Sequence, residues 1–289
     1  MFTPRFALSF SSLLGLTLAF AGCRDAPQKG DAPGSSSAQV ARASIDAELR
    51  AALAGPARTD EERARDVYRH PVETLEFFGL RDDMNVVELW APLGYYTAVL
   101  APVLRDHGKL AATLFDPNNP PKQRFGWDAK YTERLDKNPD VYSKVERVIM
   151  KPGAFSFGPD ASADLVLTFR NVHNWLSEGY SDGVFPAAFR VLKSGGVFGV
   201  VDHRGAPGMT PAQIEDTGYV PEDTIIALAT KAGFRLVARS EINANPKDTK
   251  DYPKGVWTLP PMYSMKDVDR AKYAAIGESD RMTLKFIKP

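Results

Sequence analysis

The chain has 289 residues, 44% of them hydrophobic, which is enough for one sizeable core. Lys plus Arg and Asp plus Glu each number 36, so the formal charge is zero. No basic excess points to nucleic acid and no acidic tail points to a basic partner. Two domains are possible at this length, but α/β folds often use it as one.

The first 22 residues are typical of a secretory signal. A short cationic start is followed by an apolar run over residues 6–20, too short and too serine-rich for a membrane span. The end of the run, Ala21-Gly22-Cys23, resembles a bacterial lipobox and predicts lipidation at Cys23. A chance cysteine after an ordinary signal is the alternative. Arg24 follows, which by resemblance to lipoprotein sorting rules favours the outer membrane. The expected location is therefore the periplasmic face of the cell envelope, with a lipid anchor.

Residues 23–42 are predicted to be a flexible tether, because their Pro, Gly, Ser and Ala bury too little apolar surface to fold. Residues 43–83 are predicted to form a helical cap. Its expected helices cover 44–53, the segment from the N-cap Thr59 through Tyr68, and 72–78 closed by Gly79.

Apolar runs alternate with helix-length segments along the rest of the chain. Strands are expected over 85–90, 109–115, 145–150, 163–169, 197–201, 235–242 and 281–287. Helices are expected over 95–104, 128–135, 181–192 and 222–232. This alternation predicts a doubly wound, seven-stranded, mostly parallel sheet over residues 84–289. Residues 243–275 are too long and irregular for a plain connection, which suggests a lid-like insertion.

The stretch from Val86 to Asp116 reads as strand, turn, helix and strand, the first βαβ unit of a nucleotide-binding sheet. Glu88 lies near the end of the first strand. Asp116 follows the second strand, 22 residues after Gly94, a spacing suitable for an acid that binds ribose hydroxyls. A turn aspartate before Pro117 is the alternative.

Several longer stretches carry a resemblance to a known family. They are Tyr68–Pro71, Phe169–Trp175, Val201–Arg204, Ser240–Lys250 and Gly277–Arg281. On these stretches the chain resembles a group of exported bacterial predicted methyltransferases within the class I S-adenosylmethionine-dependent methyltransferase superfamily. The resemblance covers residues 84–288. It implies a Rossmann-like methyltransferase fold with S-adenosyl-L-methionine as cofactor.

The resemblance places the cofactor beside the turn after the first strand. In the family this turn has an acid and then glycines at alternate positions, which let the backbone approach the methionine part of the cofactor. Here the acid is Glu88, and Trp90, Pro92 and Gly94 occupy the glycine positions. Two readings stay open: a reshaped but working loop, or a turn that preserves the fold and no longer binds.

Other expected cofactor contacts lie further along the chain. Asp116 would bind the ribose, and Phe155, in the segment after the third strand, would contact adenine by resemblance. Arg170, directly after the fourth strand, is expected to belong to the same site.

Polar side chains follow the fourth and fifth strands, at the sheet edge where open α/β proteins bind ligands. His173 is a candidate general base, and His203 is a second acid–base candidate. Asn171 is expected to orient the substrate or the cofactor. The alternative for His173 and Trp175 is a structural role at the sheet edge. No metal is expected, since no ligand spacing supports one.

Four further residues are expected to contact substrate: Tyr68, His70, Trp175 and Arg204. Tyr68 and His70 precede the sheet, where this fold often places a helical lid, and plain packing is their alternative. Arg204 is suited to an anionic group. The segment Glu278–Arg281 is expected to brace the insertion through an ion pair, and a solvated loop is its alternative.

These features predict an S-adenosylmethionine-dependent methyltransferase of the cell envelope that acts on a small molecule. The alternative is a non-catalytic envelope lipoprotein that reuses the fold to bind a ligand or partner. The glycine-poor turn favours this alternative, and so does the cytoplasmic origin of the cofactor. A dinucleotide oxidoreductase is a weaker reading, because the first turn lacks G-x-G-x-x-G.

Overall fold

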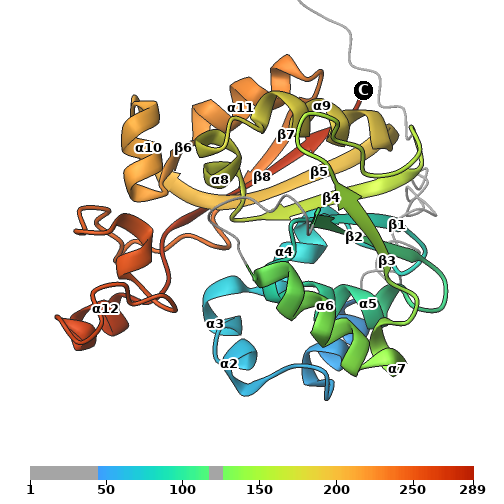
Figure 1. Ribbon diagram of the computed structural model, residues 1–289, viewed down its shortest axis with the longest axis horizontal. Helices are drawn as coiled ribbons and strands as arrows, with labels where there is room; N and C mark the ends of the chain where they lie inside the picture. The colour runs from blue at the N-terminus through green and yellow to red at the C-terminus, as the bar shows by residue number, and fades with distance from the viewer. Residues whose placement is uncertain (1–44, 117–125) are drawn as a thin grey trace, which may run out of the picture.

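A computed structural model describes residues 45–116 and 126–289 (Figure 1). The expected signal segment, the lipidated Cys23 and the tether therefore lie outside the described residues. Within the described ranges, none of the helices has both the length and the apolar character needed to cross a membrane.

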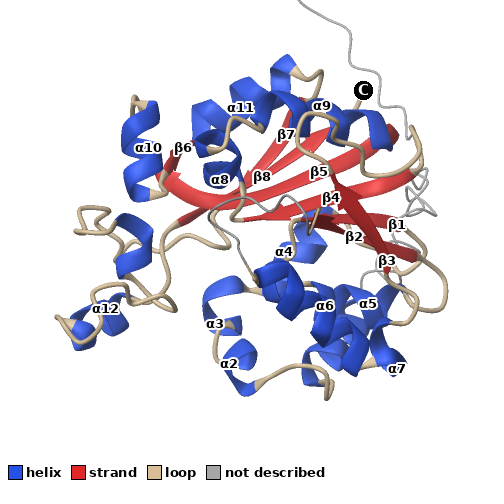
Figure 2. Cartoon of the chain, viewed as in Figure 1, coloured by secondary structure: helices blue, strands red, loops and turns tan. Residues whose placement is uncertain are grey.

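One twisted sheet runs through the molecule in the order β3-β2-β1-β4-β5-β8-β7 (Figure 2). Its strands are β1 (Asn85–Leu89), β2 (Lys109–Phe115), β3 (Glu146–Met150), β4 (Ala163–Phe169), β5 (Leu192–Gly205), β7 (Arg235–Ser240) and β8 (Arg281–Ile287). The pairs among β1 to β5 are parallel, and β8 is antiparallel to both of its neighbours. A short β6 (Val220–Pro221) pairs with the end of β5. The expected doubly wound, mostly parallel sheet is confirmed.

Helices cover both faces of the sheet (Figure 1). One face packs against a helix over residues 45–54, α4 (Pro71–Phe78), α5 (Thr97–Leu104) and α6 (Trp127–Lys137). The other packs against α8 (Val172–Ser177), α9 (Ser181–Val191) and α11 (Glu222–Lys231). Successive side chains of β1 alternate between the two cores, with Val86 in one and Val87 and Leu89 in the other. This alternation follows from the two-residue period of a strand.

The helical cap differs from expectation in one respect. The helix expected from Thr59 through Tyr68 is divided into α2 (Asp60–Arg63) and α3 (Asp66–Arg69). Thr59 caps α2 by accepting a hydrogen bond from the backbone N–H of Glu62, as its residue type predicts. His70 ends α3 in a left-handed conformation, at φ 39°, because a residue before proline avoids the right-handed helical region.

Among the described residues, four α-helices and part of β5 were not predicted. The helices are α7 (Pro139–Tyr142), α8, α10 (Pro211–Thr217) and α12 (Arg270–Ile276). β5 has 14 residues instead of the expected five, and its extension includes residues 193–196 with Gly195 and Gly196. The pairing register with β4 shifts between Ala163 and Leu165, so this glycine-containing stretch forms an irregularity within the strand.

The expected insertion contains a 3₁₀ helix, η3 (Gly255–Thr258), and α12 (Arg270–Ile276). Tyr252, Leu259 and Tyr273 form a small core of its own. It extends away from the sheet, at the lower left of Figure 1.

Candidate active site at the carboxyl ends of the strands

A cavity of about 740 Å³ opens at the carboxyl edge of the sheet. Tyr95 lines it from the turn after β1, while Arg170 and His173 line it from the segment after β4. His203 lines it from the end of β5. The volume falls within the roughly 300–1,000 Å³ of typical ligand sites. Its position at the strand ends is where open α/β sheets bind ligands.

The outer walls of this cavity come from segments outside the sheet. Arg65 and Arg69 contribute from the helical cap, and Trp127 contributes from the start of α6. Val256 and Trp257 of η3 contribute from the insertion at residues 243–275. The cavity is therefore enclosed between the cap, the sheet edge and the insertion.

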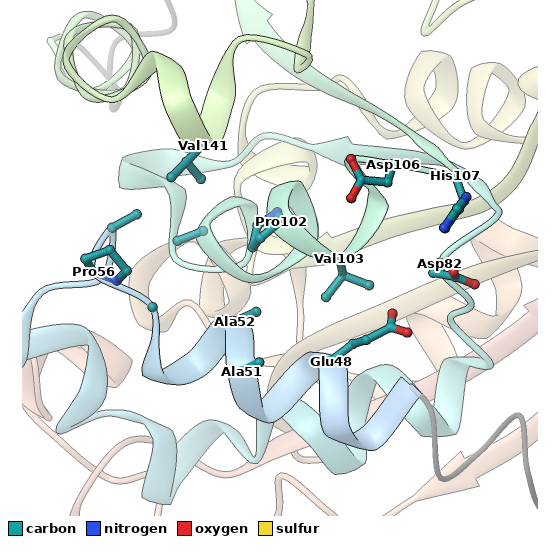
Figure 3. Close-up of a pocket in the computed structure, with 13 residues that line it drawn as sticks. Glu48, Ala51, Ala52, Pro56, Asp82, Pro102, Val103, Asp106, His107 and Val141 are labelled. Carbon is teal, nitrogen blue, oxygen red and sulfur yellow. The ribbon is translucent and has the colours of Figure 1, made fainter.

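A second cavity, of about 470 Å³, lies between the helix over 45–54 and α5 (Figure 3). Its polar lining includes Glu48, Asp82, Asp106 and His107. Asp82 precedes β1, while Asp106 and His107 precede β2, so this cavity lies at the amino ends of the strands. The carboxyl-end cavity is therefore the candidate functional site.

The imidazole of His173 is held by a buried carboxylate. His173 Nδ1 lies 3.0 Å from Asp202 Oδ1, and Asp202 is fully buried. Asp202 also accepts backbone N–H hydrogen bonds from Val172, at 2.6 Å, and His203, at 2.8 Å. His173 Nε2 has no hydrogen-bond partner in the described parts of the chain. A carboxylate that fixes one ring nitrogen leaves the other available to accept a proton.

The neighbouring His203 has a different environment. Its Nδ1 lies 2.5 Å from Ser279 Oγ, and its ring centroid lies 5.1 Å from that of His173. Burial, together with the charges of His173, Arg170 and Arg281, lowers the pKa of His203 well below its usual range. His203 is therefore neutral at physiological pH, and it lines the cavity as an uncharged imidazole.

His173, Asp202 and His203 present three possible metal-ligand atoms within 4.8 Å of one another. The carboxylate of Asp202, however, already accepts hydrogen bonds from two backbone N–H groups and contacts the His173 ring. Arg170 and Arg281 add positive charge beside His203. This arrangement suits a hydrogen-bonded acid–base pair better than a cation site.

The turn after β1 has a left-handed backbone at three residues, of which only Gly94 is a glycine. Trp90 (φ 49°), Leu93 (φ 63°) and Gly94 (φ 74°) all have left-handed conformations. Such conformations are unfavourable for residues other than glycine and persist where the surroundings impose them. Asn171 imposes this path, because its Nδ2 donates to the carbonyls of Leu89 (2.9 Å) and Trp90 (3.1 Å).

Glu88 and Gly94, both predicted to contact the cofactor, face the protein interior and not the cavity. Glu88 is 2% exposed and accepts a hydrogen bond from the hydroxyl of Thr97 at 2.6 Å. Burial raises the pKa of Glu88 to about 7, although the bond from Thr97 opposes this. A Cβ added to Gly94 would lie 2.9 Å from the ring of Tyr131, so this position requires glycine. Both residues shape the turn from behind.

Trp90 belongs to an aromatic cluster on the opposite side of the turn. Its ring centroid lies 4.6 Å from that of Phe115, 5.0 Å from Trp175 and 6.1 Å from Phe155. All four rings are at most 7% exposed. Phe155 and Trp175, expected to contact adenine and substrate, therefore pack in the core and do not line the cavity.

The other expected ligand contacts also lie outside the cavity wall. Tyr68 packs beside Gly277, His70 joins α3 to α4, and Arg204 forms an ion pair with Glu241 at 2.7 Å. Asp116 follows β2, where its N–H donates to the carbonyl of Met150. The segment Glu278–Arg281 braces the insertion through the ion pair of Asp280 with Lys250, at 3.0 Å. The structure thus brings together Arg170, His173 and His203 from the sequence-predicted set.

Sequence reasoning missed several residues of the site. The partner role of Asp202 was missed, and so were Arg65, Trp127 and Trp257. Arg69 and Arg281 were also missed, although both lie in stretches that carry the family resemblance, which was the available signal. The contribution of Trp257 had no signal beyond the length of the insertion.

The lining of the carboxyl-end cavity shows whether its residues suit S-adenosyl-L-methionine. It extends from Arg170 past Leu93 and Tyr95 to Trp127. Asp128, beside Trp127, accepts a hydrogen bond from the N–H of Phe115 at 3.2 Å, so this end of the cavity reaches the end of β2. The guanidinium of Arg170 has no ion-pair partner in the described ranges and matches a carboxylate. These residues fit the cofactor, along a path that passes Trp127 and not Phe155.

The fold is that of the class I S-adenosylmethionine-dependent methyltransferases. Among solved structures, the [4+2]-cyclase SpnF is similar over 87% of this chain and 96% of its own, with 15% identity and a TM-score of 0.54. A sarcosine dimethylglycine methyltransferase from Galdieria sulphuraria matches 78% of this chain and 86% of its own, at 13% identity and a TM-score of 0.51.

Phosphoethanolamine N-methyltransferase 2 from Haemonchus contortus, solved with S-adenosyl-L-methionine, matches 77% of this chain and 53% of its own. Its identity is 15% and its TM-score is 0.52. No protein-family model matches the sequence, and neither does any curated protein. Identities this low show a shared fold, and a cyclase among these structures shows that the fold serves more than one chemistry.

Proposed function

We propose that the protein is an S-adenosylmethionine-dependent methyltransferase that acts on a small molecule in the carboxyl-end cavity. The observation that carries the proposal is the His173–Asp202 pair, which places an oriented imidazole on the cavity wall beside the turn after β1. The fold supports it.

In this proposal the residues divide the work as follows. When bound, S-adenosyl-L-methionine supplies an electrophilic methyl group. His173 Nε2 takes a proton from the acceptor's nucleophilic atom, while Asp202 holds the ring and stabilises its charged form. Asn171 is a positioning residue, since it is fully buried and holds the turn through hydrogen bonds to two backbone carbonyls. Trp257, from the insertion, helps to exclude water from the cavity.

The cofactor would lie between Arg170 and Trp127. The guanidinium of Arg170, which forms no ion pair with any described residue, matches the cofactor's carboxylate, and Trp127 offers an aromatic ring near the end of β2. Asp116 is the acid nearest in sequence to that strand end and is the proposed partner of the ribose.

The proposal is tested with tritium in the methyl group of S-adenosyl-L-methionine. The purified full-length chain is incubated with labelled cofactor and a small-molecule extract of the cells that make the protein. Label should move to a small molecule with the wild type and stay in the cofactor with His173→Asn. A His173→Asn variant that transfers label at the wild-type rate would remove the proposed role of the imidazole.

For its place in the cell, we propose an exported lipoprotein anchored through Cys23. The support is the sequence of the first 24 residues. Mass spectrometry of the protein from its own cells tests this. A cleaved chain that begins with an acylated Cys23 is expected, and an unmodified cysteine would rule the anchor out.

A further inference from the structure

Four arginine side chains converge on one wall of the carboxyl-end cavity, and together they are called the arginine cluster. Its members are Arg65, Arg69, Arg170 and Arg281. They come from distant parts of the sequence: the cap at α3, the residue after β4 and the first residue of β8. The fold therefore assembles the cluster, and no local motif produces it.

One carboxylate, that of Glu278, pairs with three of the four arginines. Its oxygens lie 2.5 Å from Arg65 Nε and 3.5 Å from Arg69 Nε, and it also pairs with Arg281. Glu278 is only 2% exposed, and although burial opposes ionisation, the surrounding arginines hold its pKa well below the usual range. Three cations thus share one buried anion and Arg170 pairs with none of the described acids, which leaves an excess of positive charge in the cluster.

The cluster also has hydrogen-bond donors that no protein group satisfies. Within the described ranges, Arg65 Nη2, Arg69 Nε and Nη2, and Arg281 Nε are buried and have no hydrogen-bond partner. Arg69 is 3% exposed and Arg281 2% exposed, yet both line the cavity. A buried charged donor without an acceptor is strongly unfavourable, so such groups mark a place where a ligand supplies the acceptor.

Arg170 is the least compensated member. It has no ion pair in the described parts of the chain and has a left-handed conformation at φ 61°. Burial and the charges of Arg69 and Arg65 lower its pKa well below the usual range. Its charge is held against repulsion, a situation that the binding of an anion would relieve.

We propose that the arginine cluster binds an oxyanion group, a carboxylate or a phosphate, of the small molecule that enters the cavity. Guanidinium groups suit these anions because their planar N–H donors match two oxygens at once. Excess charge, unsatisfied donors and a cavity of ligand size coincide at this wall. The oxyanion belongs either to the acceptor or to the amino-acid part of the cofactor.

The proposed binding of an oxyanion does not depend on the proposed methyltransferase function. The assignment of that oxyanion to the acceptor or to the cofactor does rest on it. The test measures binding of inorganic phosphate by the purified full-length chain, by calorimetry in a low-salt buffer free of other oxyanions. Wild-type protein should bind, and Arg170→Gln should bind at least tenfold more weakly. Arg239→Gln, which changes a half-exposed arginine paired with Glu222, is the matched control and should bind as the wild type does.

A thermal unfolding scan without phosphate separates binding from structural damage. Because Arg170 is repelled by its neighbours, Arg170→Gln should unfold at the wild-type temperature or above it. A structural role would lower that temperature instead. If Arg170→Gln does not fold, Arg65→Gln gives the same comparison, because its guanidinium is closer to the surface.

Two further ligands identify the source of the oxyanion. S-adenosylhomocysteine carries the cofactor's carboxylate, and 5′-methylthioadenosine lacks it. If Arg170→Gln weakens the binding of S-adenosylhomocysteine but not that of 5′-methylthioadenosine, the oxyanion belongs to the cofactor. If it weakens the binding of neither ligand while phosphate binding falls, the oxyanion belongs to the acceptor. Phosphate binding without any cofactor binding would sink the transferase and keep the anion site. No phosphate binding by the wild type, or equal binding by Arg170→Gln, would overturn the anion site.

Discussion

His173 and Asp202 form a buried pair across two neighbouring strands, with 3.0 Å between Nδ1 and Oδ1. His173 follows β4 on α8, while Asp202 lies within β5, so the parallel pairing of these strands sets their distance. Two backbone N–H groups hold the carboxylate in place. The orientation of the imidazole is therefore built into the sheet.

Asp202→Asn should reduce methyl transfer by about 10²- to 10⁴-fold, the usual range for the loss of an acid–base group. An amide would present N–H donors where the carboxylate now accepts hydrogen bonds, so the His173 ring would lose its orientation. The measurement is the rate of label transfer from tritiated cofactor. Asp182→Asn, at an exposed acid paired with Lys231, is the control. A rate within threefold of the wild type would contradict the role of Asp202.

Glu88 should make stability depend on pH. Its pKa is raised from 4.5 to about 7 in the folded protein, chiefly by burial. The folded state therefore holds the proton more tightly, so the stabilisation is complete below about pH 4.5 and is lost as the pH rises through 7. This corresponds to about 3 kcal/mol.

The isosteric variant Glu88→Gln does not titrate. Its free energy of unfolding relative to the wild type should therefore rise by about 3 kcal/mol between pH 4.5 and 8, measured by urea denaturation. A difference that stays constant over this range would show that Glu88 is not protonated in the folded protein.

Gly94→Ala should destabilise the turn after β1 for two reasons. Its φ of 74° is unfavourable for alanine, and the new Cβ would lie 2.9 Å from the Tyr131 ring. Gly179→Ala isolates the first effect, because Gly179 has φ 72° and nothing within 4 Å. We expect a loss of roughly 1–2 kcal/mol at Gly179 and a further 1–3 kcal/mol at Gly94. Equal losses would mean that the Tyr131 ring moves away at no cost.

Glu278→Gln should cost about 3–5 kcal/mol of stability, because it leaves the arginine cluster with no carboxylate. A high concentration of sulfate should restore more stability to this variant than to the wild type, since the anion replaces the lost charge. Thermal unfolding with and without sulfate gives the comparison. Glu133→Gln, at an exposed helix position, is the control. If sulfate raised the unfolding temperature of the wild type and both variants equally, the proposed excess of positive charge in the arginine cluster would be contradicted.

The strands could be predicted because their sequences dictate them. β2, β4 and β8 occupy the predicted residues. β2 and β4 are mostly apolar runs, and β8 alternates polar residues with the buried Met282, Leu284 and Phe286. β5 begins earlier than expected, because Leu192 already pairs with Ala163 before the regular pairing resumes at Val197 and Leu165.

Part of the site followed from strand order alone. His173, His203 and Arg170 follow adjacent parallel strands, so the sequence brings them to one edge. The position of Trp175 does not follow from strand order, because α8 turns its ring into the core beside Trp90. The sequence of so short a helix does not show which of its side chains face the core. The four guanidinium groups of the arginine cluster meet only through tertiary packing.

The turn after β1 shows most clearly what cannot be predicted from the sequence. In the sequence, Trp90 and Pro92 at two of the glycine positions argue against an ordinary cofactor-binding turn. In the folded turn, Trp90 and Leu93 adopt left-handed φ angles, and Asn171 supports the turn by donating hydrogen bonds to two backbone carbonyls. Side-chain support from a distant segment cannot be deduced from the turn's own residues.

The most direct test of the account is a calorimetric titration of the purified full-length chain with S-adenosyl-L-methionine and S-adenosylhomocysteine. We expect saturable binding of both ligands, and we expect Asp116→Ala to reduce the affinity for each. A folded protein that gives no binding heat with either ligand at millimolar concentration would contradict the proposed methyltransferase.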